Sequence, residues 1–174
     1  YYDMLQNPAL ALANASVTAE GAILLALQAM PITLQAADVL ITGFGRIGKS
    51  LAGKLHALGA NVTLTARNRA QFSLIEQLSC TPDETGRYYL GLSRYDCIFN
   101  TVPAPVICDA QLSAIRPDAA LLELASLPGG FCPAAADHAG YLAARGLPGV
   151  YAPEAAAAVI RRAIFRELDL EECP

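Results

Sequence analysis

The sequence is poor in charged residues and has no concentration of basic ones. Only 16% of its 174 residues are charged, and 12 Lys and Arg stand against 16 Asp and Glu. A nucleic-acid partner requires a basic stripe that displaces the counterions of the phosphate backbone. The basic residues are instead scattered, apart from Arg67 with Arg69 and Arg161 with Arg162. We therefore expect no nucleic-acid partner.

Long apolar runs are also missing. The longest run, 22–34, is interrupted by Gln28, Pro31 and Thr33, whereas a membrane-spanning helix needs about 20 consecutive apolar residues. We therefore expect no membrane span, and no signal peptide is visible. The chain opens at Tyr1 without an initiator methionine, so we expect a fragment that lacks an N-terminal domain.

Patterns typical of metal, disulfide or nucleophilic sites are absent as well. The cysteines are odd in number and have no CxxC spacing: Cys80, Cys97, Cys108, Cys132 and Cys173. They are typical of reduced thiols in a cytosolic protein. His56 and His138 lie in expected helices far from other candidate ligands, so no metal site is expected. No nucleophile–base pair or carboxylate dyad has a recognisable spacing, and the catalytic residues stay unknown.

Apolar residues make up 54% of the chain and alternate between strand and helix patterns. Strands are expected at 38–42, 61–66, near 88–90, at 97–100 and at 120–124. Helices are expected from an N-cap at Thr18 to Pro31, and at 46–58, 68–78, 109–115, 133–144 and 153–168. This alternation predicts an α/β fold, a doubly wound parallel sheet in three αβα layers. We expect residues 1–174 to form one domain with an N-terminal linking helix.

The strongest motif is a glycine-rich turn between the expected strand 38–42 and the expected helix 46–58. Its residues are Gly43, Phe44, Gly45, Arg46, Ile47 and Gly48. In the Rossmann-type fold the first glycine permits a tight turn, the second lets the backbone approach a pyrophosphate, and the third allows close packing of helix and strand. Amides at the helix start would bind the phosphates. The alternative is a glycine-rich turn that binds nothing.

The end of the second expected strand bears on which nucleotide is bound. An NAD site usually has an acidic residue there, which accepts hydrogen bonds from the ribose hydroxyls. This sequence instead has Ala66, Arg67, Asn68 and Arg69. Two guanidinium groups would bind a 2′-phosphate by charge-assisted hydrogen bonds. We predict a preference for NADP(H), with NAD possible; the alternative is that both arginines are solvated residues at a helix start.

Two further turns follow strands on the same expected sheet edge. The strand at 97–100 leads into Asn100, Thr101, Val102 and Pro103, and the strand at 120–124 leads into Ala125 and 126–130. Ligands of open α/β sheets bind at the carboxyl ends of the strands. These turns are predicted to contact the nicotinamide half of the cofactor, or else are ordinary exits from strands. The loop 146–149 is interpreted as a connector, and 18–21 as a helix cap, with Glu20 facing a substrate as the less favoured alternative.

Together these motifs resemble the A subunit of dipicolinate synthase, a family of bacterial sporulation enzymes. The resemblance is carried by 18–22, 43–46, 58–62, 66–67, 100–103, 124–126, 128–130, 146–149 and 152–153. It implies an NADP-linked protein that works with a flavoprotein partner, the B subunit of dipicolinate synthase, in the mother-cell cytoplasm. The implied reaction oxidises a small-molecule substrate, a dihydrodipicolinate-type precursor, to dipicolinate. The chain departs from the family at Val150, Tyr151 and Glu154, and before Gly146, which concerns the substrate side more than the cofactor side.

Two alternatives stay open from the sequence. The first is the nucleotide domain of a 2-hydroxyacid or alanine dehydrogenase, folds that generally place a catalytic histidine late in the chain; His138 falls in an expected helix instead. The second is a non-catalytic NADP(H)-sensing module, because fold alone does not define function. The sequence also leaves a homo-oligomer open.

Overall fold

The fold is built on one six-stranded sheet. The computed structural model describes residues 7–86 and 91–168. The strands are β1 (Asp38–Thr42), β2 (Asn61–Ala66), β3 (Thr81–Glu84), β4 (Cys97–Asn100), β5 (Ala120–Glu123) and β6 (Tyr141–Ala143). Every pairing is parallel, in the order β3-β2-β1-β4-β5-β6. The chain therefore winds outward from β1 in both directions, which confirms the doubly wound α/β fold.

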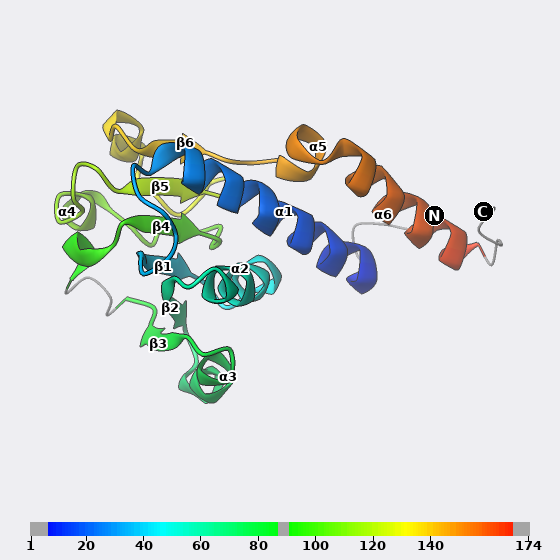
Figure 1. The fold of residues 1–174 in the computed structure, drawn as a ribbon, viewed down its shortest axis with the longest axis horizontal. Coiled ribbons are helices and arrows are strands. Elements are labelled where there is room, and N and C mark those ends of the chain that lie inside the picture. The colour runs from blue at the N-terminus through cyan, green and yellow to red at the C-terminus, as the bar shows by residue number, and fades with distance from the viewer. Residues whose placement is uncertain (1–6, 87–90, 169–174) are drawn as a thin grey trace.

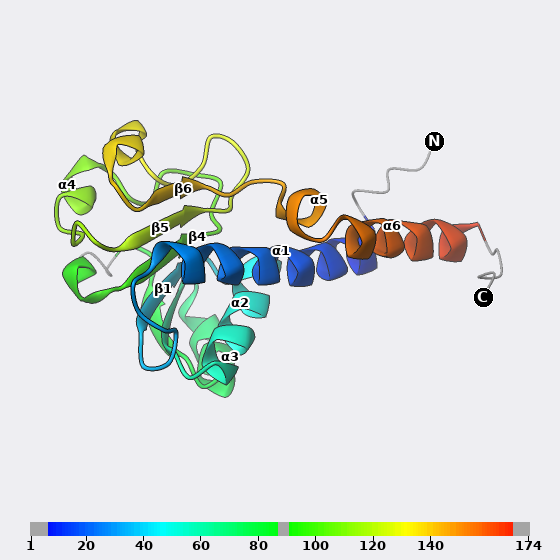
Figure 2. The same cartoon turned by 45° about the horizontal axis from the view of Figure 1, so that its top comes forward.

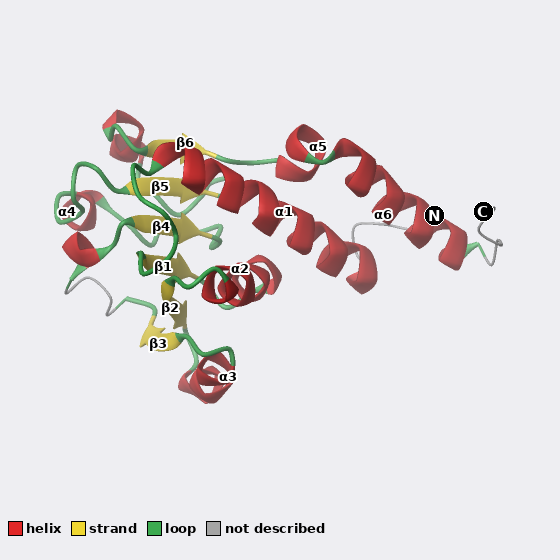
Figure 3. Cartoon of the chain, viewed as in Figure 1, coloured by secondary structure: helices red, strands yellow, loops and turns green. Residues whose placement is uncertain are grey.

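Helices cover both faces of the sheet (Figures 1 and 3). On one face lie α1 (Pro8–Ala29), α2 (Arg46–Ala57) and α3 (Phe72–Gln77), and their buried residues share one hydrophobic cluster with β1 and β2. The other face carries α4 (Asp109–Leu112) and the short 3-10 helices 92–94 and 133–137, over a smaller cluster. The helices α5 (Leu147–Tyr151) and α6 (Pro153–Glu167) follow β6. The three αβα layers are thus present, one of them thin.

The first helix starts earlier than expected. Asn7, not Thr18, is the N-cap: its side chain accepts hydrogen bonds from the amides of Ala9 and Leu10. Thr18 lies inside α1, where its hydroxyl donates to the Asn14 carbonyl oxygen at 2.8 Å. The sequence prediction was wrong here because 8–17 shows no clear amphipathic period, although its alanines favour a helix.

By length and composition α1 is long and apolar enough to cross a membrane, which the run 22–34 alone does not suggest. Its packing in the fold accounts for part of that composition, since 39% of the apolar window is buried, whereas Leu12, Leu24 and Leu27 are exposed. Ala19, Ala22 and Ala26 have no exposed surface and lie in the larger hydrophobic cluster. Beyond the sheet, α1 runs beside α6 (Figure 2). Glu20, on the exposed side, pairs with Lys54 of α2 at 2.7 Å.

Two other expectations are corrected. Residues 133–144 were expected to be helical because of their alanines, yet a 3-10 helix ends at Asp137 and β6 follows. Here a Cβ on Gly140 would lie 2.0 Å from the Ala119 carbonyl oxygen, so this glycine marks a close backbone approach. The third strand lies at 81–84, and the strand expected near 88–90 falls outside the described residues. The observed strand β3 contains Pro82, which an edge strand tolerates because one row of its N–H groups has no partner.

Candidate functional site

The glycine-rich turn forms the corner between β1 and α2. Gly43 has a φ of 98°, and a Cβ there would lie 2.7 Å from the Thr101 hydroxyl oxygen. A Cβ on Gly48 would lie 2.1 Å from the Gly43 carbonyl oxygen, so the third glycine is required for the helix to approach the turn. Gly45 is the N-cap of α2, and a Cβ there would meet nothing within 4 Å. The open space beside Gly45 and the amides of the first helical turn fit a pyrophosphate.

A cleft of about 690 Å³ lies beside this corner, at the carboxyl ends of β1, β2 and β4. The strand order reverses between β1 and β4, and this is the place where open α/β sheets bind ligands. The cleft is lined by Gly43, Phe44, Gly45, Ala66, Arg67, Asn68, Gln71, Thr85, Thr101, Val102, Pro103, Ala104, Pro105 and Val106. Nine of the residues singled out in the sequence are among them. The lining residues that sequence reasoning missed are Gln71, Thr85 and 104–106, which carry no motif.

The two arginines after β2 have different surroundings. Arg67 lines the cleft and is exposed, and its guanidinium has no hydrogen bond or ion pair among the described residues. Arg69 is outside the cleft lining, and its Nη2 pairs with Glu84 Oε2 at 2.9 Å. Glu84 stands opposite Ala66 in the register of β2 and β3. The structure therefore places one uncommitted guanidinium, not two, at the cleft.

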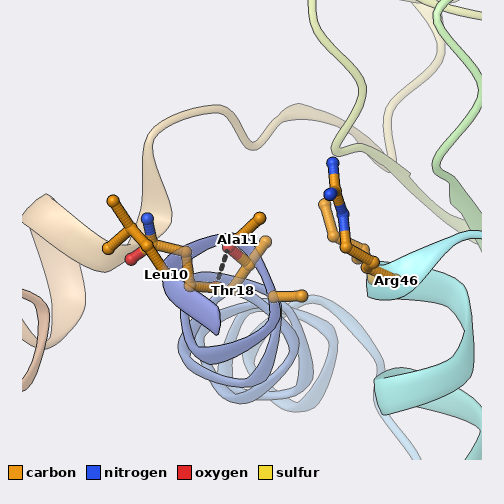
Figure 4. A pocket seen from close by; sticks show the side chains of 7 residues that line it. Leu10, Ala11, Thr18 and Arg46 are labelled. Atoms are coloured by element: carbon orange, nitrogen blue, oxygen red, sulfur yellow. Dashed lines mark hydrogen bonds between the residues drawn. The ribbon is translucent and has the colours of Figure 1, made fainter. Parts of the chain in front are cut away.

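Arg46 and Ile47 line a different, smaller pocket of about 220 Å³ between α2 and α1. Figure 4 shows the Arg46 side chain at the start of α2, beside the face of α1 that carries Leu10, Ala11 and Thr18. The Thr18 hydroxyl in this pocket is already bonded within its own helix. Glu20 pairs with Lys54 on the surface. The less favoured alternative, a Glu20 that faces a substrate, therefore has no support in the structure.

Asn100 and Ala125 lie behind the cleft rather than in its lining. Asn100 has no exposed surface, and its amide donates to Glu123 at 2.6 Å and to the Val102 carbonyl oxygen at 3.0 Å. The Ala125 amide donates to Glu123 at 3.0 Å. Glu123, which is 1% exposed, was missed from the sequence, where it is one residue of an apolar strand. The available signal was a lone carboxylate in such a strand.

The described part of the chain contains neither a candidate metal site nor a disulfide. Residues 7–86 and 91–168 hold no group of three or more His, Cys, Asp or Glu suited to a metal. The ring of His138 contacts the Arg116 carbonyl oxygen at 3.1 Å and accepts from the Gly140 amide, outside the cleft. Burial raises the pKa of the Cys97 thiol well above its usual range. The described cysteines are all free thiols, Cys80, Cys97, Cys108 and Cys132, and Cys173 lies outside the described residues.

A parallel doubly wound sheet with a glycine corner and a cleft at its switch point defines a dinucleotide-binding domain. Residues 10–126 match the family model of the D-isomer specific 2-hydroxyacid dehydrogenase, NAD binding domain, and the chain belongs to this family. Among its relatives is the A subunit of dipicolinate synthase from Bacillus subtilis (strain 168), which is 32% identical over 97% of this chain and 59% of the relative. The family therefore supports a nicotinamide cofactor.

Solved structures give the same grouping. The crystal structure of the dipicolinate synthase A subunit from Bacillus halodurans has a TM-score of 0.91 and 30% identity, over 98% of this chain and 59% of that one. The corresponding structure from Bacillus subtilis also scores 0.91, with 31% identity over 97% of this chain and 57% of that one. A transhydrogenase from Sinorhizobium meliloti, at 0.75 and 14% identity, shows the fold alone. The chain thus spans less than two thirds of the length of its relatives.

Proposed function

We propose that this chain binds NADP(H) as the nucleotide domain of an oxidoreductase similar to the A subunit of dipicolinate synthase. The observation that carries the proposal is the cleft in which Gly43, Gly45 and Arg67 meet. The amides at the start of α2 would hold the pyrophosphate. Arg67, with no carboxylate at Ala66 to repel a phosphate, would bind the 2′-phosphate. The bound nicotinamide would supply hydride-transfer chemistry, while the chain orients it.

The likeness to the relatives extends the proposal to the whole protein. It would act with the flavoprotein B subunit of dipicolinate synthase on a dihydrodipicolinate-type precursor and yield dipicolinate during sporulation, in the mother-cell cytoplasm. A turnover assay of the intact protein with its flavoprotein partner tests this proposal. The cofactor should change its redox state when the substrate is added, whereas binding of the cofactor without turnover would favour a sensing role.

The direct test of the cofactor assignment is calorimetric titration of the chain with NADPH and with NADH. We expect both to bind, NADPH the more tightly. Tighter binding of NADH would refute the preference for NADP(H). Binding of neither would refute the proposed function.

The family match favours one second candidate, a 2-hydroxyacid dehydrogenase. Such an enzyme would need a base near the nicotinamide, and His138 is occupied by the Arg116 carbonyl oxygen and the Gly140 amide outside the cleft. Assays of the intact protein with a panel of 2-hydroxy acids separate the two candidates. Turnover of a hydroxy acid would favour the second.

A further inference from the structure

Glu123 carries a buried carboxylate whose two oxygens are both saturated with hydrogen bonds. Its Oε1 accepts from the Asn100 amide at 2.6 Å and from the Ala125 backbone amide at 3.0 Å. Its Oε2 accepts from the backbone amides of Gly130 at 2.7 Å and Phe131 at 3.1 Å. A buried charge is costly unless its hydrogen-bonding capacity is met. This carboxylate therefore holds its four donor groups in fixed positions.

Through Asn100, Glu123 Oε1 holds the beginning of the cleft wall, which is formed by residues 101–106. Asn100, held by Glu123 Oε1, donates through the same amide group to the Val102 carbonyl oxygen and accepts from the Val102 amide at 3.2 Å. The Thr42 hydroxyl also donates to the Asn100 side-chain oxygen. Asn100 thus ties the wall to the ends of β1 and β5.

The second oxygen acts on the far end of the same wall. Gly130, whose amide donates to Glu123 Oε2, accepts at its carbonyl oxygen from the amides of Val106 and Ile107, each at 2.9 Å. One residue therefore links the carboxylate to the point where the wall ends. Glu123 holds both ends of the wall 101–106 although none of its own atoms belongs to the cleft lining.

Two glycines make this arrangement sterically possible. A Cβ on Gly130 would lie 2.4 Å from the Asn100 side-chain nitrogen, so the amide of Asn100 packs closely against the backbone. A Cβ on Gly129, at a φ of 87°, would lie 2.8 Å from Glu123 Oε2. The segments 100–103 and 128–130, which the sequence showed as separate motifs, are thus parts of one hydrogen-bonded unit.

We propose that Glu123 is a positioning residue that shapes the wall 101–106 to receive the nicotinamide half of the dinucleotide. The inference rests on the proposed function. In the sheet, β2 and β4 flank β1 on opposite sides. Because Arg67 after β2 is placed at the adenine-ribose end and the α2 amides at the pyrophosphate, the wall after β4 faces the remaining half. Glu123 therefore acts mainly on that half.

The test compares NADP⁺ with adenosine 2′,5′-bisphosphate, which lacks the nicotinamide half, by calorimetry on the full chain. In Glu123→Gln, the new NH₂ group faces backbone or Asn100 donors in either orientation. We expect NADP⁺ affinity to fall by about tenfold or more, and bisphosphate affinity to change by less than about twofold, since only one half loses its support. Glu123→Asp keeps the charge on a shorter arm and should show the same split at a smaller size, should the first variant fail to fold.

Leu122→Ala is the matched control, because Leu122 is buried on the same strand but belongs to the hydrophobic cluster that contains no residue of the wall. It should lower the Tm without separating the two ligands. Equal losses for both ligands in the Glu123 variants, or no loss for either, would overturn the positioning role. Failure of the unsubstituted chain to bind either ligand would instead refute the proposed function.

Discussion

Arg67→Ala should weaken NADPH binding selectively. The guanidinium is exposed at the cleft, so its removal disturbs no contact within the described residues. Hydrogen bonds to a charged group contribute about 1.5–3 kcal/mol, and exposure places this site at the lower end. Since each 1.4 kcal/mol is about tenfold in affinity, the expected loss is roughly 10-fold to 30-fold. NADH, which has no 2′-phosphate, should lose less than about threefold by the same reasoning.

Arg69→Ala supplies the control. It removes the same charge two residues away, so general attraction for an anionic ligand falls equally in both variants. Its guanidinium is engaged with Glu84, an exposed pair that contributes about 0–1 kcal/mol to stability. Fluorescence titrations with both reduced cofactors, at low and at physiological salt, would give the four affinities required. Equal losses of NADPH affinity in the two variants, or an equal loss of NADH affinity in Arg67→Ala, would refute the 2′-phosphate assignment.

The glycine corner and an exposed ion pair give two further predictions. Gly48→Ala should lower the free energy of unfolding by about 1–3 kcal/mol, because the new Cβ meets the Gly43 carbonyl oxygen. Gly45→Ala should barely change the Tm but should weaken dinucleotide binding; thermal unfolding and ligand titration measure the two effects, and equal Tm values for the two variants would refute the packing argument. The Arg116 guanidinium, chiefly through its hydrogen bonds to Asp118, lowers the pKa of that carboxyl to about 2. The resulting stabilisation of the folded state is complete above about pH 4 and is lost as the pH falls through 2. In Arg116→Ala the pKa of Asp118, measured by NMR titration, should return to the ordinary range of a carboxyl group. An unchanged pKa would contradict the assigned cause.

The sequence was sufficient where structure follows from local constraints. The strand 38–42, the corner and the helix that follows occur where expected, because Gly48 is required by its close approach to Gly43, only five positions away. Gly43 also approaches the distant Thr101 side chain, a contact that no local motif shows. The helix at 153–167 was likewise recognisable from its length and composition. The identification of the cleft follows from the same local motifs, since parallel strands bring their carboxyl ends to one edge.

The sequence was insufficient where the outcome depended on distant partners. No strand was expected at 81–84, yet Pro82 lies in an edge strand there, a position that only the complete sheet defines. A helix was expected to run from 133 to 144, yet it ends at Asp137, and Gly140 must approach the backbone of Ala119. The pairing of Arg69 with Glu84, fifteen residues away, could not be inferred from either residue alone.

The two sides of the cleft differ in how their shape is maintained. The phosphate corner requires residues without side chains, and each of its glycines meets this requirement independently of the others. The wall opposite depends on Asn100, Glu123 and Gly130 as a set, in which every buried polar side-chain atom has a partner in the described residues. A partly satisfied buried network is less stable than an apolar replacement of all its members. Single substitutions within the set are therefore more harmful than their size suggests, and the wall can change its chemistry only when all three positions change together.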